Sequence, residues 1–378
     1  MAPIRIGFIG LSASGRWASD AHLPYLRDSP KYTITALCNS SVEAAHAAIK
    51  AHNLPSSTKA YGSPQDLAND PDIDLVVCSV RVDRHYDAII PALEAGKDCF
   101  CEWPLGKNLE EGKELAALAK KKGVKTIVGL QAGQSPIVKK VKDLVGGGRI
   151  GKVLSVTYVA AAWNMGAVEV DNLAYINHKE VGGNMVTIHF SHGFYALLYA
   201  LGELKSYTSI LEVKRPQVSL IDKSLASPDS KVIGTTTRTS HDQVLLQGHL
   251  ESGALLSYHL RGGKAFANAP GLLWCIYGES GEIQITSSGS ALQVGYPDTK
   301  IEIHDHTSEV VEVVEPESDG WEKLPIPAQN TARLYEVFAD GKTAEYPDWD
   351  EAVVRHKLVK ELYQRETENA ERASEYLL

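Results

Sequence analysis

Residues 4–17 read IRIGFIGLSASGRW, and this stretch decides the fold of the first part of the chain. The apolar run Ile4–Ile9 predicts a buried strand, and a helical pattern begins near Trp17. The loop between them is built from small residues, which let backbone N–H groups approach a phosphate while the helix dipole favours an anion. A dinucleotide-binding fold builds its pyrophosphate turn in this order. Because Ser12 stands where the second glycine of GxGxxG belongs, an ordinary turn between strand and helix is the alternative.

The alternation of apolar runs and amphipathic stretches continues to about residue 130. Continuous apolar strands separated by amphipathic helices are typical of a parallel sheet that is covered on both faces. The sequence therefore predicts an α/β fold with an N-terminal Rossmann domain, a doubly wound parallel sheet. Further strands are expected at Tyr32–Cys38, Ile73–Val80, Asp98–Glu102 and Val124–Leu130, and helices at Trp17–Arg27, Val42–Ala51, Tyr86–Ala95 and Leu109–Lys122.

From about Lys152 the pattern changes to short alternating runs with Gly and Ser turns. Alternation such as Val244, Leu246, Gly248 and Leu250 indicates antiparallel strands with one face covered. An α+β domain with a large, mostly antiparallel open sheet is expected, and the apolar stretch 184–201 could form a covering helix. The expected strands are Val153–Ala162, Tyr207–Val213, Val232–Thr237, Val244–Leu250, Ala254–Leu260, Leu272–Tyr277 and Ile283–Ile285.

The expected domains are 1–135, which would bind NAD(P), 136–345, for substrate and dimerisation, and 346–378, a C-terminal helix. Residues 301–320 carry seven acidic residues and no Lys or Arg. We expect the end of this segment to be a solvated loop rather than a binding patch, with His304 and His306 exposed.

The chain has 378 residues, 44% of them hydrophobic, and a formal charge of −9. That charge disfavours a direct reader of nucleic-acid backbone, and no apolar run approaches the roughly 20 residues of a membrane span. The N-terminus carries no signal-peptide pattern, so a cytoplasmic location is expected. The five cysteines lack CxxC spacing and fit small buried residues in a reducing compartment.

The second predicted strand ends at Asn39-Ser40-Ser41. An acidic residue there would accept hydrogen bonds from the ribose 2′-hydroxyl and would repel a 2′-phosphate. Hydroxyl and amide groups can instead donate to phosphate, and Arg16 could add a positive charge. The sequence therefore favours NADP as cofactor, with NAD as the alternative.

Three motifs occur together in this chain: GLSASGRWASDAHLPYL at 10–26, CEWPL at 101–105, and Gly182-Gly183 followed nine residues later by His192. With GLQAGQSP at 129–136, they resemble the glucose–fructose oxidoreductase and inositol dehydrogenase family (Gfo/Idh/MocA). Within it, the branch of fungal galactose-regulon repressors and their oxidoreductase relatives looks most similar. The resemblance implies a Rossmann domain followed by an α/β domain whose open sheet is often a dimer face.

Two residues depart from the family pattern. The family's dehydrogenases carry Glu-Lys-Pro, whose lysine lies near the nicotinamide and the substrate hydroxyl, whereas this chain has Trp103. Their aspartate four residues before the histidine is Ile188 here, so the resemblance retains only His192. Since hydride transfer needs a group that moves the hydroxyl proton, His192 and His189 are the expected catalytic residues. The alternatives are Tyr158, Tyr175, Lys179, or no such group at all.

Cofactor contacts are expected from the first loop, the ends of the predicted strands and the Glu-Trp segment. Trp103, Trp163 and Tyr175 are expected to line the substrate pocket, and His22 is expected to be a packing residue. His189 and His192 share a helix face, but no third ligand has suitable spacing, so no metal is expected. The cofactor contacts are Gly10, Ser12, Ala13, Ser14, Gly15, Arg16, Trp17, Asn39, Ser40, Ser79, Val80, Arg81, His85, Glu102, Trp103 and Gln131.

The expected function is an NAD(P)-dependent oxidoreductase that acts on a sugar-like or small hydroxyl or carbonyl substrate as a homodimer. Neither a membrane nor a nucleic acid is an expected direct partner. The missing lysine and aspartate favour two alternatives: an NAD(P)-sensing regulator resembling the repressor, or a lyase, epimerase or cyclase on the same scaffold.

Overall fold

The computed structural model describes residues 2–222 and 231–376, and the chain divides into two compact units. Unit 1 comprises Met1–Gln134 and Ser318–His356, and unit 2 comprises Ser135–Glu317 and Lys357–Leu378. The first boundary lies within one residue of the position expected from the sequence. The second differs, because residues 318–345, expected in the second domain, return to unit 1.

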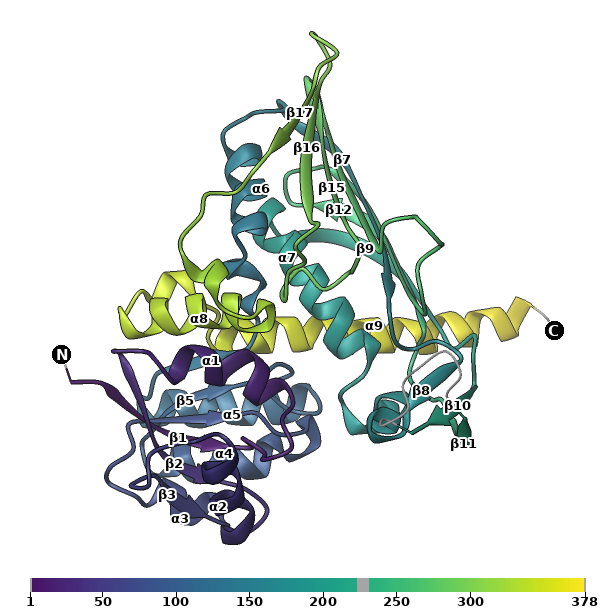
Figure 1. Ribbon diagram of the computed structural model, residues 1–378. Helices are drawn as coiled ribbons and strands as arrows, with labels where there is room; N and C mark the ends of the chain where they lie inside the picture. The colour runs from purple at the N-terminus through teal and green to yellow at the C-terminus, as the bar shows by residue number, and fades with distance from the viewer. Residues whose placement is uncertain (1, 223–230, 377–378) are drawn as a thin grey trace. The chain divides into compact units, whose positions relative to one another are not determined.

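Unit 1 contains a six-stranded sheet in which every neighbouring pair is parallel (Figure 1). Its order, β3-β2-β1-β4-β5-β6, is that of a dinucleotide-binding fold, so the predicted doubly wound sheet is confirmed. The order reverses between β1 and β4, where such sheets bind ligands at the carboxyl ends of their strands. The strands are β1 Ile4–Ile9, β2 Tyr32–Cys38, β3 Lys59–Tyr61, β4 Leu75–Cys78, β5 Asp98–Cys101 and β6 Thr126–Val128.

The helices of unit 1 begin and end where their capping residues allow. Ser41 and Asn108 cap α2 and α5, because each accepts a hydrogen bond from a first-turn amide, and Gly123, at φ 68°, ends α5. A π-helical turn, Ala18–His22, leads into α1. The helices are α1 Leu23–Leu26, α2 Val42–Ala51, α3 Pro64–Ala68, α4 His85–Glu94, α5 Leu109–Lys122 and α8 Ile326–Ala339.

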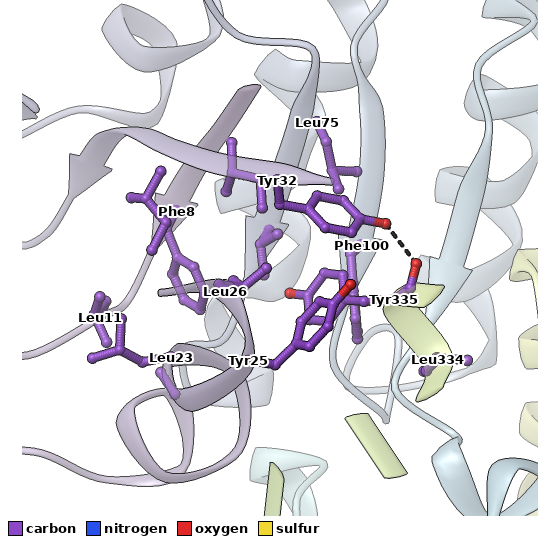
Figure 2. Close-up of a cluster of buried hydrophobic side chains, with 14 of the residues drawn as sticks. Phe8, Leu11, Leu23, Tyr25, Leu26, Tyr32, Leu75, Phe100, Leu334 and Tyr335 are labelled. Atoms are coloured by element: carbon purple, nitrogen blue, oxygen red, sulfur yellow. Dashed lines mark hydrogen bonds between the residues drawn. The ribbon is translucent and has the colours of Figure 1, made fainter. Parts of the chain in front are cut away.

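A cluster of buried side chains explains why residues 318–356 belong to unit 1 (Figure 2). Tyr335 of α8 is fully buried against Tyr25, Tyr32 and Phe100, and the hydroxyl of Tyr32 donates to the carbonyl oxygen of Tyr335 over 2.7 Å. Aromatic side chains contribute large buried apolar areas, so this contact outweighs the proximity of α8 to the second domain in sequence.

Unit 2 contains the large open sheet that the sequence predicts (Figure 1). Its eight strands follow the order β17-β16-β15-β14-β7-β13-β12-β9, and only the β7–β13 pair is parallel. A second sheet has the order β11-β10-β8. The strands are β7 Val153–Ala162, β8 Val168–Val170, β9 Leu204–Glu212, β10 Gln217–Ile221, β11 Val232–Thr237, β12 Gln243–Leu250, β13 Leu255–Gly262, β14 Leu272–Gly278, β15 Gly281–Ser287, β16 Lys300–Asp305 and β17 Val311–Val314.

One face of this sheet is covered by helices, of which α6 (Pro136–Gly146) packs against α7 (Ser191–Leu201). Phe190 and Phe194 contact Tyr258 of β13 edge-on, so the apolar stretch 184–201 covers the sheet as predicted. The last helix, α9, spans Trp349–Tyr376, and the final two residues of the predicted C-terminal helix lie outside the described part. Among the described residues, no helix is long and apolar enough to cross a membrane.

Several elements are absent from the sequence-based prediction. Strands β3, β8 and β10 and the helix α3 are short, and short elements carry little hydrophobic periodicity. The acidic segment contains the hairpin β16–β17, and residues 315–319 have no regular structure, as expected of a solvated loop.

Candidate functional site

The first loop of unit 1 starts where the ends of three strands meet. The amide of Gly10 donates to the carbonyl oxygen of Cys38, and that of Ser79 donates to Ile9, both over 3.0 Å. Gly10 has φ +101°, and a Cβ there would lie 2.4 Å from the carbonyl oxygen of Ser79. Glycine is therefore required at this position, because the backbones of β1 and β4 approach too closely for a side chain.

The loop 12–16 is short, mostly exposed and held by its own polar groups. The hydroxyls of Ser12 and Ser14 lie 3.0 Å apart, and the amide of Gly15 donates to the carbonyl oxygen of Ser12. The amide of Arg16 donates to the hydroxyl of Ser19 over 2.9 Å, while the Arg16 side chain is exposed. Small side chains and one free-standing cation fit the pyrophosphate of a dinucleotide, and Trp17 precedes the helical segment that follows.

The turn after β2 supplies no carboxylate between Asn39 and Ser41. The side-chain Nδ2 of Asn39 donates to the carbonyl oxygen of Leu11 over 2.9 Å, so this side chain holds the first loop in place. Ser40 is exposed, and Ser41 caps α2. The sequence reasoning missed Glu43 in the first turn of α2, whose pKa is lowered by hydrogen bonds to its own backbone and to Ser41. Its negative charge opposes the preference for a 2′-phosphate.

The residues after β4 are tied to the segment after β5 by His85. The Nε2 atom of His85 lies 3.0 Å from the carbonyl oxygen of Val80, and its Nδ1 lies 2.8 Å from that of Pro104. Burial lowers the pKa of this histidine. Arg81 forms an ion pair with Asp83 at 2.6 Å. His85 thus joins the segment after β4 to the segment after β5, and its ring is buried.

One group of metal-ligand type exists in the described part of unit 1. Cys78, His85 and Cys101 bring their donor atoms within 4.8 Å of one another. Burial raises the pKa of the Cys101 thiol well above its usual range, and both nitrogens of His85 face carbonyl oxygens. A metal would need a thiolate and a free imidazole nitrogen, which this arrangement does not supply.

Trp103 packs inside unit 1. Its ring lies 4.7 Å from that of His356 in the first part of α9, and both residues are buried. Burial lowers the pKa of His356 to about 4. The indole therefore occupies an interior position of unit 1, and its contact with a cofactor or substrate stays a prediction.

Glu102 forms a hydrogen-bonded chain with two buried residues. Its Oε1 atom lies 2.7 Å from Nε2 of His22, and Nδ1 of His22 lies 2.8 Å from the hydroxyl of Tyr335. His22 is fully buried between Phe8 and Phe100, so the expected packing residue also has a polar function. A Cβ at Gly129 would lie 2.6 Å from Oε2 of Glu102. The carboxylate therefore fits here only because residue 129 has no side chain. Gln131, which follows, is buried with its Oε1 unpartnered.

The two expected catalytic histidines lie in unit 2. His189 belongs to a π-helical segment, Met185–Phe190, that begins at the capping residue Asn184, and His192 lies in α7. The Nδ1 atom of each ring has no hydrogen-bond partner, and burial lowers the pKa of His189 to about 4 and of His192 to about 3. Both imidazoles are therefore neutral at physiological pH and can offer hydrogen bonds.

The remaining candidates of unit 2 lie in different surroundings. Trp163 is 63% exposed, and Tyr175 lies in the 3₁₀ segment Asp171–Asn177. Tyr158 stacks on Tyr258, and the burial of Tyr158 raises its pKa. Lys179 binds Glu366 at 3.2 Å and stacks on a tyrosine ring, so Tyr158 and Lys179 are both engaged in structural contacts.

Comparison with known proteins agrees with the fold of both units. The model of an oxidoreductase family with an NAD-binding Rossmann fold, GFO_IDH_MocA, covers residues 4–130, and that of the Gal80p C-terminal domain covers residues 136–287. Dehydrogenase aclE of Aspergillus oryzae is 32% identical over an alignment of 373 positions that covers 94% of each chain. The chain belongs to the Gfo/Idh/MocA family. The predicted resemblance to the Gal80 branch is confirmed by the match to the Gal80p C-terminal domain.

A regulator is among the relatives of this Gfo/Idh/MocA chain. The galactose/lactose metabolism regulatory protein GAL80 of Saccharomyces cerevisiae is 29% identical over an alignment that covers 78% of this chain and 69% of the GAL80 chain. The crystal structure of a super-repressor mutant of Gal80p shares the fold, with a TM-score of 0.87, 24% identity and 97% coverage of both chains.

Proposed function

We propose that this protein is an NAD(P)-dependent oxidoreductase acting on a sugar-like or small hydroxyl or carbonyl substrate. The observation that carries the proposal is the nucleotide-binding end of unit 1, where Gly10 lets β1 and β4 meet beneath an exposed loop of small residues. The similarity to a dehydrogenase along nearly the whole chain supports turnover. When bound, the cofactor supplies the hydride acceptor or donor.

Residues of the first loop and of the segments that follow the strands of unit 1 would bind this cofactor. The backbone of Ser12, Ala13 and Ser14 faces the pyrophosphate, since small side chains leave it accessible. Arg16 and the hydroxyl of Ser40, both exposed, serve the adenosine ribose or its phosphate. The segments that follow β4 and β5 flank the nicotinamide end. In this proposal His192 stays neutral and contributes a hydrogen bond to the substrate oxygen.

We expect NADP to bind more tightly than NAD. Arg16 and Ser40 favour a 2′-phosphate and Glu43 opposes it, so the preference should be moderate and should grow in Glu43→Gln. An exposed charge pair contributes up to about 1 kcal/mol, which is roughly fivefold in Kd. Titration calorimetry with both cofactors measures this, and Glu94→Gln, at the far end of α4, is the matched control. Tighter binding of NAD overturns the preference, and no binding of either overturns the function.

We further propose that the uncovered face of the large sheet forms a homodimer interface. This face exposes Leu255, Ile210, Val159 and Tyr277, each between 43% and 55% accessible. Large apolar side chains exposed on an open sheet face favour an interaction site, and a two-fold contact would cover them.

Light scattering should therefore report about twice the 41.1 kDa of the chain at micromolar concentration. Leu255→Arg places a charge in this face and should yield a monomer. Val42→Arg, on an exposed position of α2, is the control and should stay dimeric. A wild-type monomer contradicts the interface.

A second function is supported by specific residues. Trp103 and Ile188 replace the family's ionisable pair, and the regulator GAL80 is among the relatives. In that case, NAD(P) binding would tune a contact with another protein and no substrate would turn over.

A further inference from the structure

The hydrogen-bond network of Glu102, His22 and Tyr335 lies at the carboxyl edge of the unit 1 sheet, where we propose that the cofactor binds. The amide of Glu102 donates to the carbonyl oxygen of Cys78 over 3.1 Å, which places Glu102 beside the end of β4. This is the edge of the sheet where the order of the strands reverses and ligands bind. Glu102 is the acidic residue of its motif, and the neighbouring Trp103 cannot titrate.

The hydrogen bonds of this chain have a defined direction. An ionised carboxylate only accepts, so Nε2 of His22 carries the proton that is donated to Oε1 of Glu102. In the tautomer that carries its proton on Nε2, Nδ1 accepts from the hydroxyl of Tyr335, whose pKa burial raises well above its usual range. Both nitrogens of the His22 ring have partners, and the ring lies between Phe8 and Phe100, so it cannot rotate without losing both hydrogen bonds.

The second carboxylate oxygen of Glu102 is left for a ligand. Within the described residues, Oε2 has no hydrogen-bond partner, and the side chain is 13% exposed. The other titratable groups near it, His85 and Cys101, are buried and directed to backbone oxygens. Oε1 of Glu102 is therefore fixed by His22, while Oε2 lies beside the backbone of Gly129, where the absence of a side chain leaves it unpartnered.

We propose that Glu102 is the group that takes the substrate proton, and that His22 is its positioning residue. In alcohol oxidation the substrate C–H bond breaks with its electron pair, which passes as hydride to the oxidised nicotinamide. The O–H bond breaks, its proton goes to Oε2 of Glu102, and the C=O bond forms. The reverse sequence returns the proton. This inference rests on the proposed function, because the cofactor is the oxidant.

Glu102→Gln removes the basic oxygen while keeping the size and one acceptor for His22. It should lower kcat by about 10²–10⁴-fold, the usual range for a general base, and leave the cofactor Kd almost unchanged. Glu102→Ala should regain activity when formate is added, since formate can replace the missing carboxylate. Glu110→Gln, on the surface of α5, is the control.

The apoprotein provides a readout that does not depend on turnover. With ¹⁵N-labelled histidine, the ring signals of His22 should show a proton on Nε2, and Glu102→Gln should shift them. His22→Gln, which keeps an N–H donor, should retain more kcat than His22→Leu.

The possible outcomes separate the two proposals. Full turnover in Glu102→Gln, or a His22 ring protonated at Nδ1 alone, overturns this inference and leaves the oxidoreductase intact. Equal loss of cofactor affinity and turnover in Glu102→Gln makes Glu102 a cofactor contact instead of the base. No turnover by the wild type overturns the proposed function and this inference with it.

Discussion

Replacing Ser12 with aspartate should weaken the binding of NADP and NAD by at least about 100-fold. The new carboxylate would lie in the loop that we propose as the pyrophosphate site, where the hydroxyls of Ser12 and Ser14 lie 3.0 Å apart. A like charge at about 4 Å costs roughly 1 kcal/mol in water and about 4 kcal/mol near a protein surface, and a pyrophosphate carries two charges. Titration calorimetry gives the two dissociation constants.

Ser12→Gly is the matched variant, because it restores the glycine of the dinucleotide motif. It should bind the cofactor at least as tightly as the wild type, since a smaller side chain leaves the backbone equally accessible. Thermal melts without cofactor should be nearly unchanged in both variants. Wild-type affinity in Ser12→Asp would show that the pyrophosphate does not bind at this loop.

His192→Ala should lower kcat by about 10²–10³-fold, the range for losing a hydrogen bond to a reacting oxygen. The imidazole is buried and its pKa is lowered to about 3, so it remains neutral wherever the protein is assayed. Protonation of His192 therefore begins only well below pH 5, and the profile of kcat between pH 5 and 9 should carry no step from this residue. Steady-state kinetics across that range measures both effects.

His189→Ala is the comparison for His192, because the two histidines lie three residues apart in neighbouring turns and both lack a partner at Nδ1. A loss confined to His192→Ala, with cofactor affinity unchanged, supports a contact with the substrate. Equal losses in both variants, together with lower melting temperatures, would assign both histidines to packing. Full activity in His192→Ala removes the residue from the mechanism.

The sequence predicts the parts of the fold that local patterns control. The strand Ile4–Ile9, the small-residue loop after it and the helix 109–122 with its Gly123 end are all present, because apolar periodicity and glycine conformation act over few residues. The open sheet of unit 2 follows equally from alternation.

Contacts between distant residues could not be predicted in this way. Tyr335 is 313 residues from His22, and no periodicity links them, yet their hydrogen bond completes the chain that holds Glu102. Trp103 is buried because His356 packs on it, which also joins residues far apart in sequence. A histidine between a strand and a proline, as in HLPYL, is the one local signal that could have indicated a polar role for His22.

The most direct test of the oxidoreductase assignment measures the absorbance of reduced nicotinamide. The wild-type protein would be mixed with NADP or NAD and a broad panel of sugars, polyols and simple alcohols, with Ser12→Asp as the control for cofactor binding. We predict that the absorbance of reduced cofactor rises with at least one panel member in the wild type and not in Ser12→Asp. Tight cofactor binding by the wild type without any rise, and without consumption of NADPH or NADH by the matching carbonyl compounds, would contradict the account and indicate a cofactor-sensing regulator.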